Sequence, residues 1–354
     1  MLDLQDILSI IGALFDAIAS GLVALYYGFA AFPSGLAFVV GVIGALAFGL
    51  VTPISFQAET LVLVGGLGKN IKERLSIVIL AGIMMGILGA FGFLGAVLDF
   101  IGEDILSGML AGVGIILARA GLTLMKEHYP SGIVSMIVAL SVFFFHGDLA
   151  YMIAASILAG TAVYVFMTKG RTNAGLQDLD PVLTARKLNF TKPIFNNWGV
   201  WRAALAVCTL QIGANISYGT ITGQIANHPV DIDKLTVVSA LADFVSALFG
   251  GAPMESIIAV TATGTHPVTA GIIFMAIMAV ILLSGLLPKL ARWIPISSTS
   301  GYLFVLGAVL VVPDNMAAAV GGNPLVGSIT AVVTAISDPF IGMLAGIIVR
   351  MITG

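Results

Sequence analysis

The chain carries very little charge. Only 9% of its 354 residues are charged, whereas 59% are hydrophobic. A soluble domain carries about 25% charged residues, so this composition excludes a soluble protein and indicates an integral membrane protein. The net charge of −3 is small and gives no reason to expect a nucleic-acid partner.

Two further scarcities narrow the class. Cys208 is the sole cysteine, which excludes an intrachain disulfide and any cysteine-based metal cluster. The alternating pattern of a membrane β-barrel is also missing. We therefore expect an all-α, multi-pass protein of the plasma membrane that holds no metal and no organic cofactor.

Apolar stretches divide the chain into two halves around a polar linker, 168–198. In the first half they are 7–28, 35–52, 75–98, 105–125, 131–147 and 149–167, and in the second 199–224, 235–250, 267–287, 296–312, 317–335 and 337–353. Each half also contains a shorter segment, 53–68 and 251–265, in which a proline, Pro53 or Pro253, precedes a glutamate. We expect each of these two segments to be a broken span. This gives about fourteen segments, seven in each half.

The two broken segments share a pattern, E-[S/T]-x3-V-x3-G. It begins at Glu59 and again at Glu255, 196 residues later. A second echo relates the stretch from Ser107 to that from Ser300, at an offset of 193. Because each half has an odd number of segments, the repeats must be inverted in the membrane. Interrupted segments at corresponding positions are the best sequence indication of a transporter's binding site.

Basic residues are concentrated on one side of the expected topology. Only Lys234 and Arg350 fall on the other side. The positive-inside rule makes the basic side cytoplasmic and would place both termini outside. The basic side carries Lys69, Lys72, Arg74, Arg119, Lys126, Lys169, Arg171, Arg186, Lys187, Lys192, Arg202, Lys289 and Arg292.

Several motifs of the second half resemble the nucleobase–cation symporters. They are Ser239-Ala-Leu-Ala-Asp243, Ala247-Leu-Phe-Gly250, Glu255-Ser256 with Val260 and Gly264, Thr269-Ala270, and Pro288 with Ile294-Pro295. In the first half, Gly112-Val-Gly-Ile and Ala120-Gly-Leu resemble the hypoxanthine/guanine/adenine permease branch. The resemblance is clearest over 235–312 and fainter over 50–125.

This resemblance implies a core domain and a gate domain, each built from both repeats. The core would comprise 1–100 and 199–294, and the gate 101–167 and 295–354. It further implies short strands before the half-helices, a nucleobase substrate moved with a proton or sodium ion, and a homodimer that pairs through the gate domains. The substrate-contacting glutamate of the family corresponds to Glu255.

The chain departs from the family at several points. Ile216 stands where the family has an acidic residue in the eighth span, with Asn215 and Ser217 as the nearest polar candidates. The stretch from Gly250 to Glu255 is about one helical turn short. If the glycines and Pro253 are the true anchor, Ala259 takes the place of the glutamate. The family's cytoplasmic termini also oppose the charge distribution.

Glu59 and Glu255 are the leading candidates for substrate binding and ion coupling. If each half-helix begins just before its glutamate, unpaired N–H groups lie beside the carboxylate and favour its charged form. Burial and a second nearby carboxylate favour the neutral form. We therefore expect the pair to share one proton. The alternative is that each glutamate only caps a helix or bonds a neighbouring one.

Other polar groups at membrane depth are weaker candidates. Asp16 in the first span and Asp243 in the ninth are candidates for ion coupling, because an intramembrane carboxylate is expensive; a buried interhelical hydrogen bond is the alternative for each. Candidate substrate contacts near the broken segments are Ser55, Gln57, Met254, Ser256, Asn215, Ser217 and Tyr218. We interpret His146 and Asp148 as a solvated turn between two spans.

These features favour a secondary transporter that works by alternating access, with a purine or pyrimidine as the leading substrate. An anion transporter of the sulfate or bicarbonate type on the same fold is the main alternative. Such a protein should keep carboxylates away from its half-helix N-termini, so Glu59 and Glu255 count against it. An intramembrane enzyme or a structural membrane protein is a third class, but no metalloprotease or serine-nucleophile motif occurs.

Overall fold

The computed structural model describes residues 2–168, 186–291 and 293–353. Most of the expected polar linker, including Lys169 and Arg171, lies outside these residues, as does Arg292. The first half contains α1 (Leu4–Tyr26), α2 (Ala31–Phe48), β1 (Ile54–Ser55), α3 (Ala58–Leu67), α4 (Ile71–Ala90), α5 (Leu94–Ile101), α6 (Glu103–Met125), α7 (Tyr129–His146) and α8 (Leu149–Met167).

The second half repeats this order of elements. It contains α10 (Trp198–Ile225), α11 (Ile232–Leu248), β2 (Glu255–Ser256), η1 (Val260–Thr263), α12 (Pro267–Leu283), α13 (Leu286–Ala291), η2 (Ile296–Thr299), α14 (Ser300–Val305), η3 (Leu306–Val311), α15 (Val312–Gly322), α16 (Pro324–Ile336) and α17 (Pro339–Thr353). With α5 and α13 as short connections, seven segments lie in each half. The expected all-α fold is confirmed.

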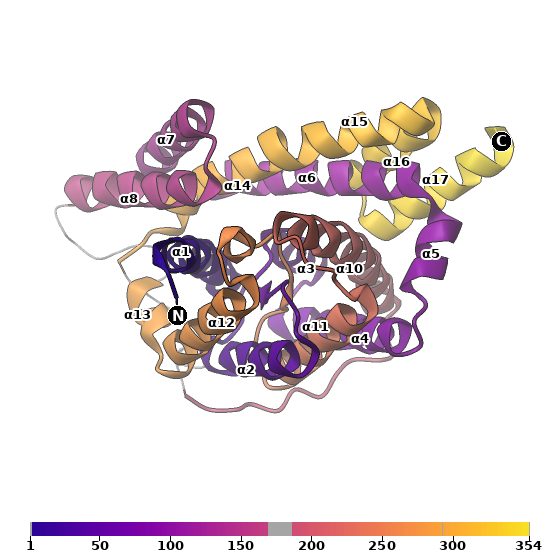
Figure 1. Cartoon of the computed structure of the whole chain (residues 1–354). Coiled ribbons are helices and arrows are strands. Elements are labelled where there is room, and N and C mark those ends of the chain that lie inside the picture. The colour runs from indigo at the N-terminus through magenta and orange to yellow at the C-terminus, as the bar shows by residue number, and fades with distance from the viewer. Residues whose placement is uncertain (1, 169–185, 292, 354) are drawn as a thin grey trace.

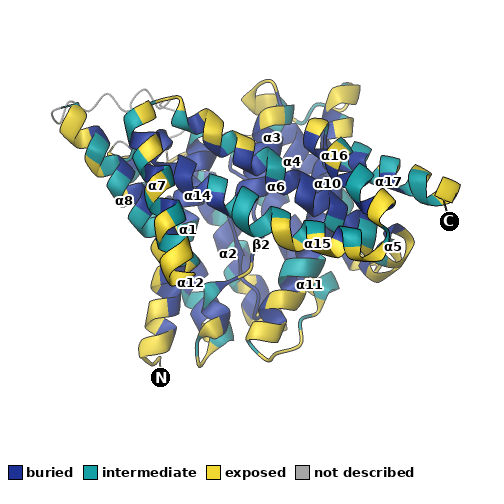
Figure 2. Cartoon of the chain, turned by 90° about the horizontal axis from the view of Figure 1, so that it is seen from above, coloured by how far each residue is buried: buried dark blue, intermediate teal, exposed yellow. Residues whose placement is uncertain are grey.

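The protein is a multi-pass membrane protein. Eight helices within the described residues are long and apolar enough to cross a membrane. Figure 2 shows exposed residues along α7, α8 and α17 and buried ones toward α6 and α10. Phe145 and Phe166 are each 85% exposed, which suits side chains that face lipid tails.

The helices form two layers, each drawn from both halves (Figure 1). In the lower layer, α2 and α4 pack against α11, and α12 packs against α1 and α2. In the upper layer, α6 packs against α14, α15 and α16, and α7 packs against α8 and α14. The layers meet where α3 contacts α6 and where α10 contacts α17.

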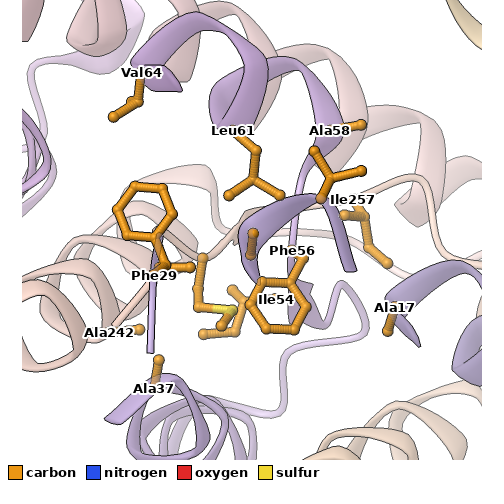
Figure 3. Close-up of a cluster of buried hydrophobic side chains, with 14 of the residues drawn as sticks. Ala17, Phe29, Ala37, Ile54, Phe56, Ala58, Leu61, Val64, Ala242 and Ile257 are labelled. Atoms are coloured by element: carbon orange, nitrogen blue, oxygen red, sulfur yellow. The ribbon is translucent and has the colours of Figure 1, made fainter. Parts of the chain in front are cut away.

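The two strands form a small antiparallel sheet in the lower layer. β1 and β2 pair antiparallel, with Ile54 opposite Ser256 and Ser55 opposite Glu255. Because the strands run in opposite directions, α3 and η1 leave the pair at opposite ends, and both begin among buried residues. Figure 3 shows the apolar side chains around this sheet, among them Ile54, Phe56 and Leu61.

Two expected span boundaries were wrong. The fourth span ends at Ala90, because Gly92 turns the chain with a φ of 70° and α5 follows separately. The twelfth span does not end near residue 312 but runs on to Gly322. The π-helical turn η3 ends two residues before Pro313, so the helix accommodates a residue that cannot donate a backbone hydrogen bond.

Glycine permits close helix contact in the upper layer. A Cβ on Gly112 of α6 would lie 2.6 Å from the carbonyl oxygen of Ala331 and 2.4 Å from Cβ of Thr334, both on α16. Small residues at such contacts let helices approach in lipid, where no hydrophobic effect drives their association.

We predict that Gly112→Ala lowers the melting temperature of the detergent-solubilised protein by several degrees, because overpacking costs about 1–3 kcal/mol. The matched control is Gly321→Ala in α15, where an added Cβ meets nothing within 4 Å. Equal melting temperatures for the two variants would contradict this account of the α6–α16 contact.

Candidate functional site

The half-helix register differs from the expected one. α3 begins at Ala58 after the N-cap residue Gln57, and η1 begins at Val260 after Ala259. The helix starts are thus 202 residues apart (260 − 58), so Gln57 corresponds to Ala259 and Glu59 to Thr261. The expectation that Glu255 opens the second half-helix was wrong, because Glu255 lies in strand β2, five residues earlier.

Unpaired polar side chains lie at or just before the start of each half-helix. Ser55, Gln57 and Thr261 are at most 3% exposed. Among the described residues, Ser55 Oγ, Gln57 Nε2 and Thr261 Oγ1 have no hydrogen-bond partner. Leaving such a group buried and unpaired costs about 1–3 kcal/mol. Groups of this kind therefore indicate a place for a polar ligand or water.

Gln57 is oriented by a neighbouring side chain. The hydroxyl of Thr60 donates to Gln57 Oε1 at 2.6 Å. The carbonyl end of the amide is therefore occupied and its NH₂ end is left as a free donor. Gln57 makes no capping hydrogen bond to α3, so its amide adds to the helix N–H groups instead of using one.

Two carboxylates lie close to this point. Glu59, in the first turn of α3, is 5% exposed, and the Tyr218 hydroxyl of α10 donates to its Oε1 at 3.4 Å. Asp16 of α1 is half-buried and lies within electrostatic range of Glu59. Tyr302 of α14 is fully buried, and its hydroxyl lies 3.4 Å from Ser20 Oγ of α1. The site is therefore built from both halves and both layers.

Glu255 belongs to a different cluster, inside the lower layer. Gln211 Nε2 of α10 donates both to Asp243 Oδ2 at 2.8 Å and to Glu255 Oε1. The backbone N–H of Met254 donates to Asp243 Oδ1 at 2.6 Å. Both carboxylates are 1% exposed. The cluster joins α10, α11 and β2, and no hydrogen bond among the described residues links it to Glu59, although Glu255 lies opposite Ser55 in the strand pair.

A second set of hydrogen bonds holds β2 to the same helices. Ser256 donates to Asn215 Oδ1 at 2.6 Å, and Asn215 Nδ2 donates to Thr236 at 3.0 Å and Ser239 at 3.4 Å. These bonds occupy Asn215 and Ser256, which were expected to contact substrate. Ser217 is half-buried, and no hydrogen bond of its side chain is seen within the described residues.

The end of η1 is tied to the start of α1. Gln5 Nε2 donates to the Thr263 carbonyl at 2.6 Å, and the His266 backbone donates to Asp6 at 2.9 Å. The Thr265 hydroxyl donates to Asp3, which holds the pKa of that carboxyl below its usual value. These contacts fix the position of the short helix at its far end.

No group of three or more histidine, cysteine, aspartate or glutamate residues suited to a metal ion occurs in the described ranges. His146 and Asp148 form an exposed turn, as interpreted from the sequence, and Asp148 caps α8 by accepting from the Tyr151 N–H at 2.9 Å.

The sequence reasoning missed Gln211, Thr261 and Tyr302. Gln211 was detectable, because a glutamine inside an apolar span needs a partner. Tyr302 directly follows Ser300-Gly301, a pair of residues that indicated only the internal repeat with Ser107-Gly108. Thr261 carried no signal until the half-helix register was known.

Comparison of the sequence with protein-family models and with curated proteins found no match. Solved structures share the fold. The transmembrane domain of a cyanobacterium bicarbonate transporter, BicA, is 15% identical with a TM-score of 0.72, and the match covers 97% of this chain and 95% of that one.

Two structures of SLC26A9 also match. One is 12% identical with a TM-score of 0.62 and is matched over 97% of this chain and 65% of that chain. The other, the murine Solute Carrier 26 family member A9 anion transporter in the inward-facing state, is 14% identical with a TM-score of 0.65, over 99% and 68%. This chain thus spans about two thirds of the length of those chains.

These matches correct the family expected from the motifs. At such low identity they establish the fold alone. The proteins that share it here are bicarbonate and anion transporters, which overturns the expected nucleobase permease. The motifs misled because Glu255 matched the family glutamate by spacing while lying outside the half-helix.

We predict that Gln211→Leu strongly destabilises the protein, because it leaves two buried carboxylates without their shared donor. Removing one partner from a buried charged network costs about 3–5 kcal/mol. The control, Gln224→Leu, makes the same change at an exposed position of the same helix. Thermal unfolding in detergent measures both, and similar curves would show that the cluster contributes nothing.

Proposed function

We propose that this protein is a secondary active transporter that moves a small inorganic anion, such as bicarbonate, by alternating access. The observation that carries the proposal is the set of unpaired donors where α3 and η1 begin, in a fold shared over 95% of a bicarbonate transporter domain. The corrected register also removes one argument against an anion, since Glu255 does not lie at a half-helix N-terminus.

The anion would be bound mainly by hydrogen bonds. The first N–H groups of a helix have no intrahelical partner and favour negative charge. At α3 they are joined by the free Gln57 amide, and the hydroxyls of Ser55 and Thr261 add two further donors. No lysine or arginine is needed at this depth, because neutral donors can hold an anion that later has to leave.

The charge balance of the site requires a cation. Glu59 and Asp16 would both be near the anion, and like charges about 5 Å apart repel by roughly 3 kcal/mol at an effective dielectric constant of about 20. A proton or a sodium ion that enters with the anion removes this repulsion. We therefore assign ion coupling to Glu59 and Asp16, and a structural role to Asp243 and Glu255.

We further propose that the lower layer is the core domain, which carries the donors and carboxylates of the site, and that the upper layer is the gate domain. The boundaries 1–100 and 199–294 for the core, and 101–167 and 295–354 for the gate, are kept in this proposal. The basic end of the molecule, around Lys69 and Arg119, would face the cytoplasm. We also propose that two copies of the protein pair through their gate domains.

Uptake into proteoliposomes tests the function. Purified protein should take up labelled bicarbonate, sulfate or chloride faster than empty liposomes, and one of these anions should compete with the others. No uptake of any of them, under either a sodium or a proton gradient, would contradict the proposal.

We predict that Thr261→Val reduces anion transport at least several-fold at equal protein level, because it removes a buried donor while keeping side-chain volume. Thr263→Val is the matched control on the same short helix, at an exposed position. The comparison uses initial rates of uptake in proteoliposomes. Equal loss in both variants would assign the effect to the helix and not to the site.

We predict that Glu59→Gln abolishes accumulation driven by the coupling cation, because the neutral amide removes the charge that the cation balances. Downhill exchange of anion should continue. The measurement is anion accumulation in proteoliposomes with an imposed sodium or proton gradient, with Glu103→Gln at an exposed position as the control. Unchanged accumulation in Glu59→Gln would rule out this carboxylate as the coupling group.

A further inference from the structure

A cleft of about 430 Å³ opens between the two layers at the basic end of the molecule. Its lower wall comes from the end of α1, with Tyr26 and Tyr27, and from the second half of α3. Its upper wall comes from α6 and the end of α16. The cleft is therefore formed by elements that change their mutual position if the layers move.

The cleft follows α3 toward the candidate site. Val62, Leu63, Gly66 and Leu67 of α3 line it. Glu59 precedes Leu63 by one helical turn on the same helix, and side chains at this spacing share a face. The cleft thus lies on the face of α3 that carries Glu59.

Arg119 is the single charged residue among those that line the cleft. Its side chain is exposed, and its one hydrogen bond within the described residues is long, from Nη1 to the Ala335 carbonyl at 3.5 Å. A guanidinium has five N–H donors. Most of these remain free for a ligand.

The neighbouring Arg74 shows the contrast. It donates to the carbonyls of Tyr27 at 2.6 Å, Gly68 at 3.0 Å and Gly65 at 3.0 Å. Its donors are used to hold the C-terminal end of α3 in place. Arg74 is therefore structural, whereas Arg119 has no comparable task.

The charges around the cleft favour an anion. Glu127 accepts a hydrogen bond from the Tyr26 hydroxyl at 3.3 Å and is exposed, but Lys126 beside it in the chain offsets its charge. No carboxylate lines the cleft itself. A low-dielectric groove with one sign of charge concentrates ions of the opposite sign.

We infer that this cleft is an anion-recruiting vestibule in which Arg119 makes the first contact with the incoming small anion. This inference rests on the proposed function for the destination of the anion. The recruitment itself is an electrostatic property of the cleft. It can therefore be measured without transport.

Charged thiol reagents test the recruitment directly. Thr123 lines the cleft one turn after Arg119, is exposed, and donates its hydroxyl to the Arg119 carbonyl at 2.9 Å. In a Cys208→Ala background, Thr123→Cys is labelled with a negatively charged sulfonatoethyl and a positively charged trimethylammonioethyl methanethiosulfonate. The rates are divided by those for a small free thiol.

We predict that the ratio of anionic to cationic labelling at Thr123→Cys falls at least 3-fold when Arg119→Gln is added. With Arg119→Lys instead, the ratio should stay close to its original value, because the positive charge is retained. The control site, Thr269→Cys in α12, is exposed and does not line the cleft. Its ratio of anionic to cationic labelling should be the same whether residue 119 is Arg, Gln or Lys. An unchanged ratio at Thr123→Cys after Arg119→Gln overturns the inference.

Transport kinetics separate this inference from the proposed function. Arg119→Gln should raise the KM for the anion several-fold and leave the maximal rate unchanged. If no anion is transported but the labelling ratio depends on Arg119, the vestibule stands and the proposed function fails. If anions are transported, and Arg119→Gln changes neither the KM nor the labelling ratio, the vestibule is refuted and the proposed function stands.

Discussion

The pairing of two very short strands is the constraint on which the rest of this structure depends. In lipid every backbone polar group needs a partner, so a chain can leave the helical state at mid-depth only inside the protein. The pairs Ile54–Ser256 and Ser55–Glu255 satisfy that need for both repeats at once. They let α3 and η1 begin in the interior, where helix N–H groups and the side chains of Gln57 and Thr261 become available to a ligand.

The same pairing explains the two polar clusters. Because β2 carries Glu255 toward α10 and α11, its carboxylate is bound by Gln211 beside Asp243, and the strand is held in place. Glu59, already inside its half-helix, stays near Asp16 and Tyr218. Glu255 thus holds β2 to α10, and in the proposed function Glu59 sets the charge of the anion site. Acidic residues in the site of an anion carrier are compatible with anion binding if a cation travels with the anion, because the cation balances their negative charge.

The membrane class, the two halves and both broken segments were predictable, since apolar stretches and the prolines that precede Glu59 and Glu255 directly reflect the lipid environment. The register of the second half-helix was not. Glu59 and Glu255 match in sequence pattern, but where η1 starts depends on strand pairing and on the hydrogen bond from Thr222 to the Ile257 carbonyl, which are long-range contacts. The twelfth span, expected to end near residue 312, likewise runs on, and a π-helical turn precedes Pro313 within it. The substrate class followed the misplaced glutamate and was therefore wrong.

The central claim is that an anion binds where α3 and η1 begin, at groups that have no hydrogen-bond partner among the described residues. The most direct measurement is an experimental structure of the protein in bromide, with the ion located by its anomalous scattering. The account predicts a peak within hydrogen-bond distance of Gln57 Nε2 and the first N–H groups of α3, lost in Gln57→Leu. Bromide peaks confined to the protein surface, with none beside Gln57, would contradict it.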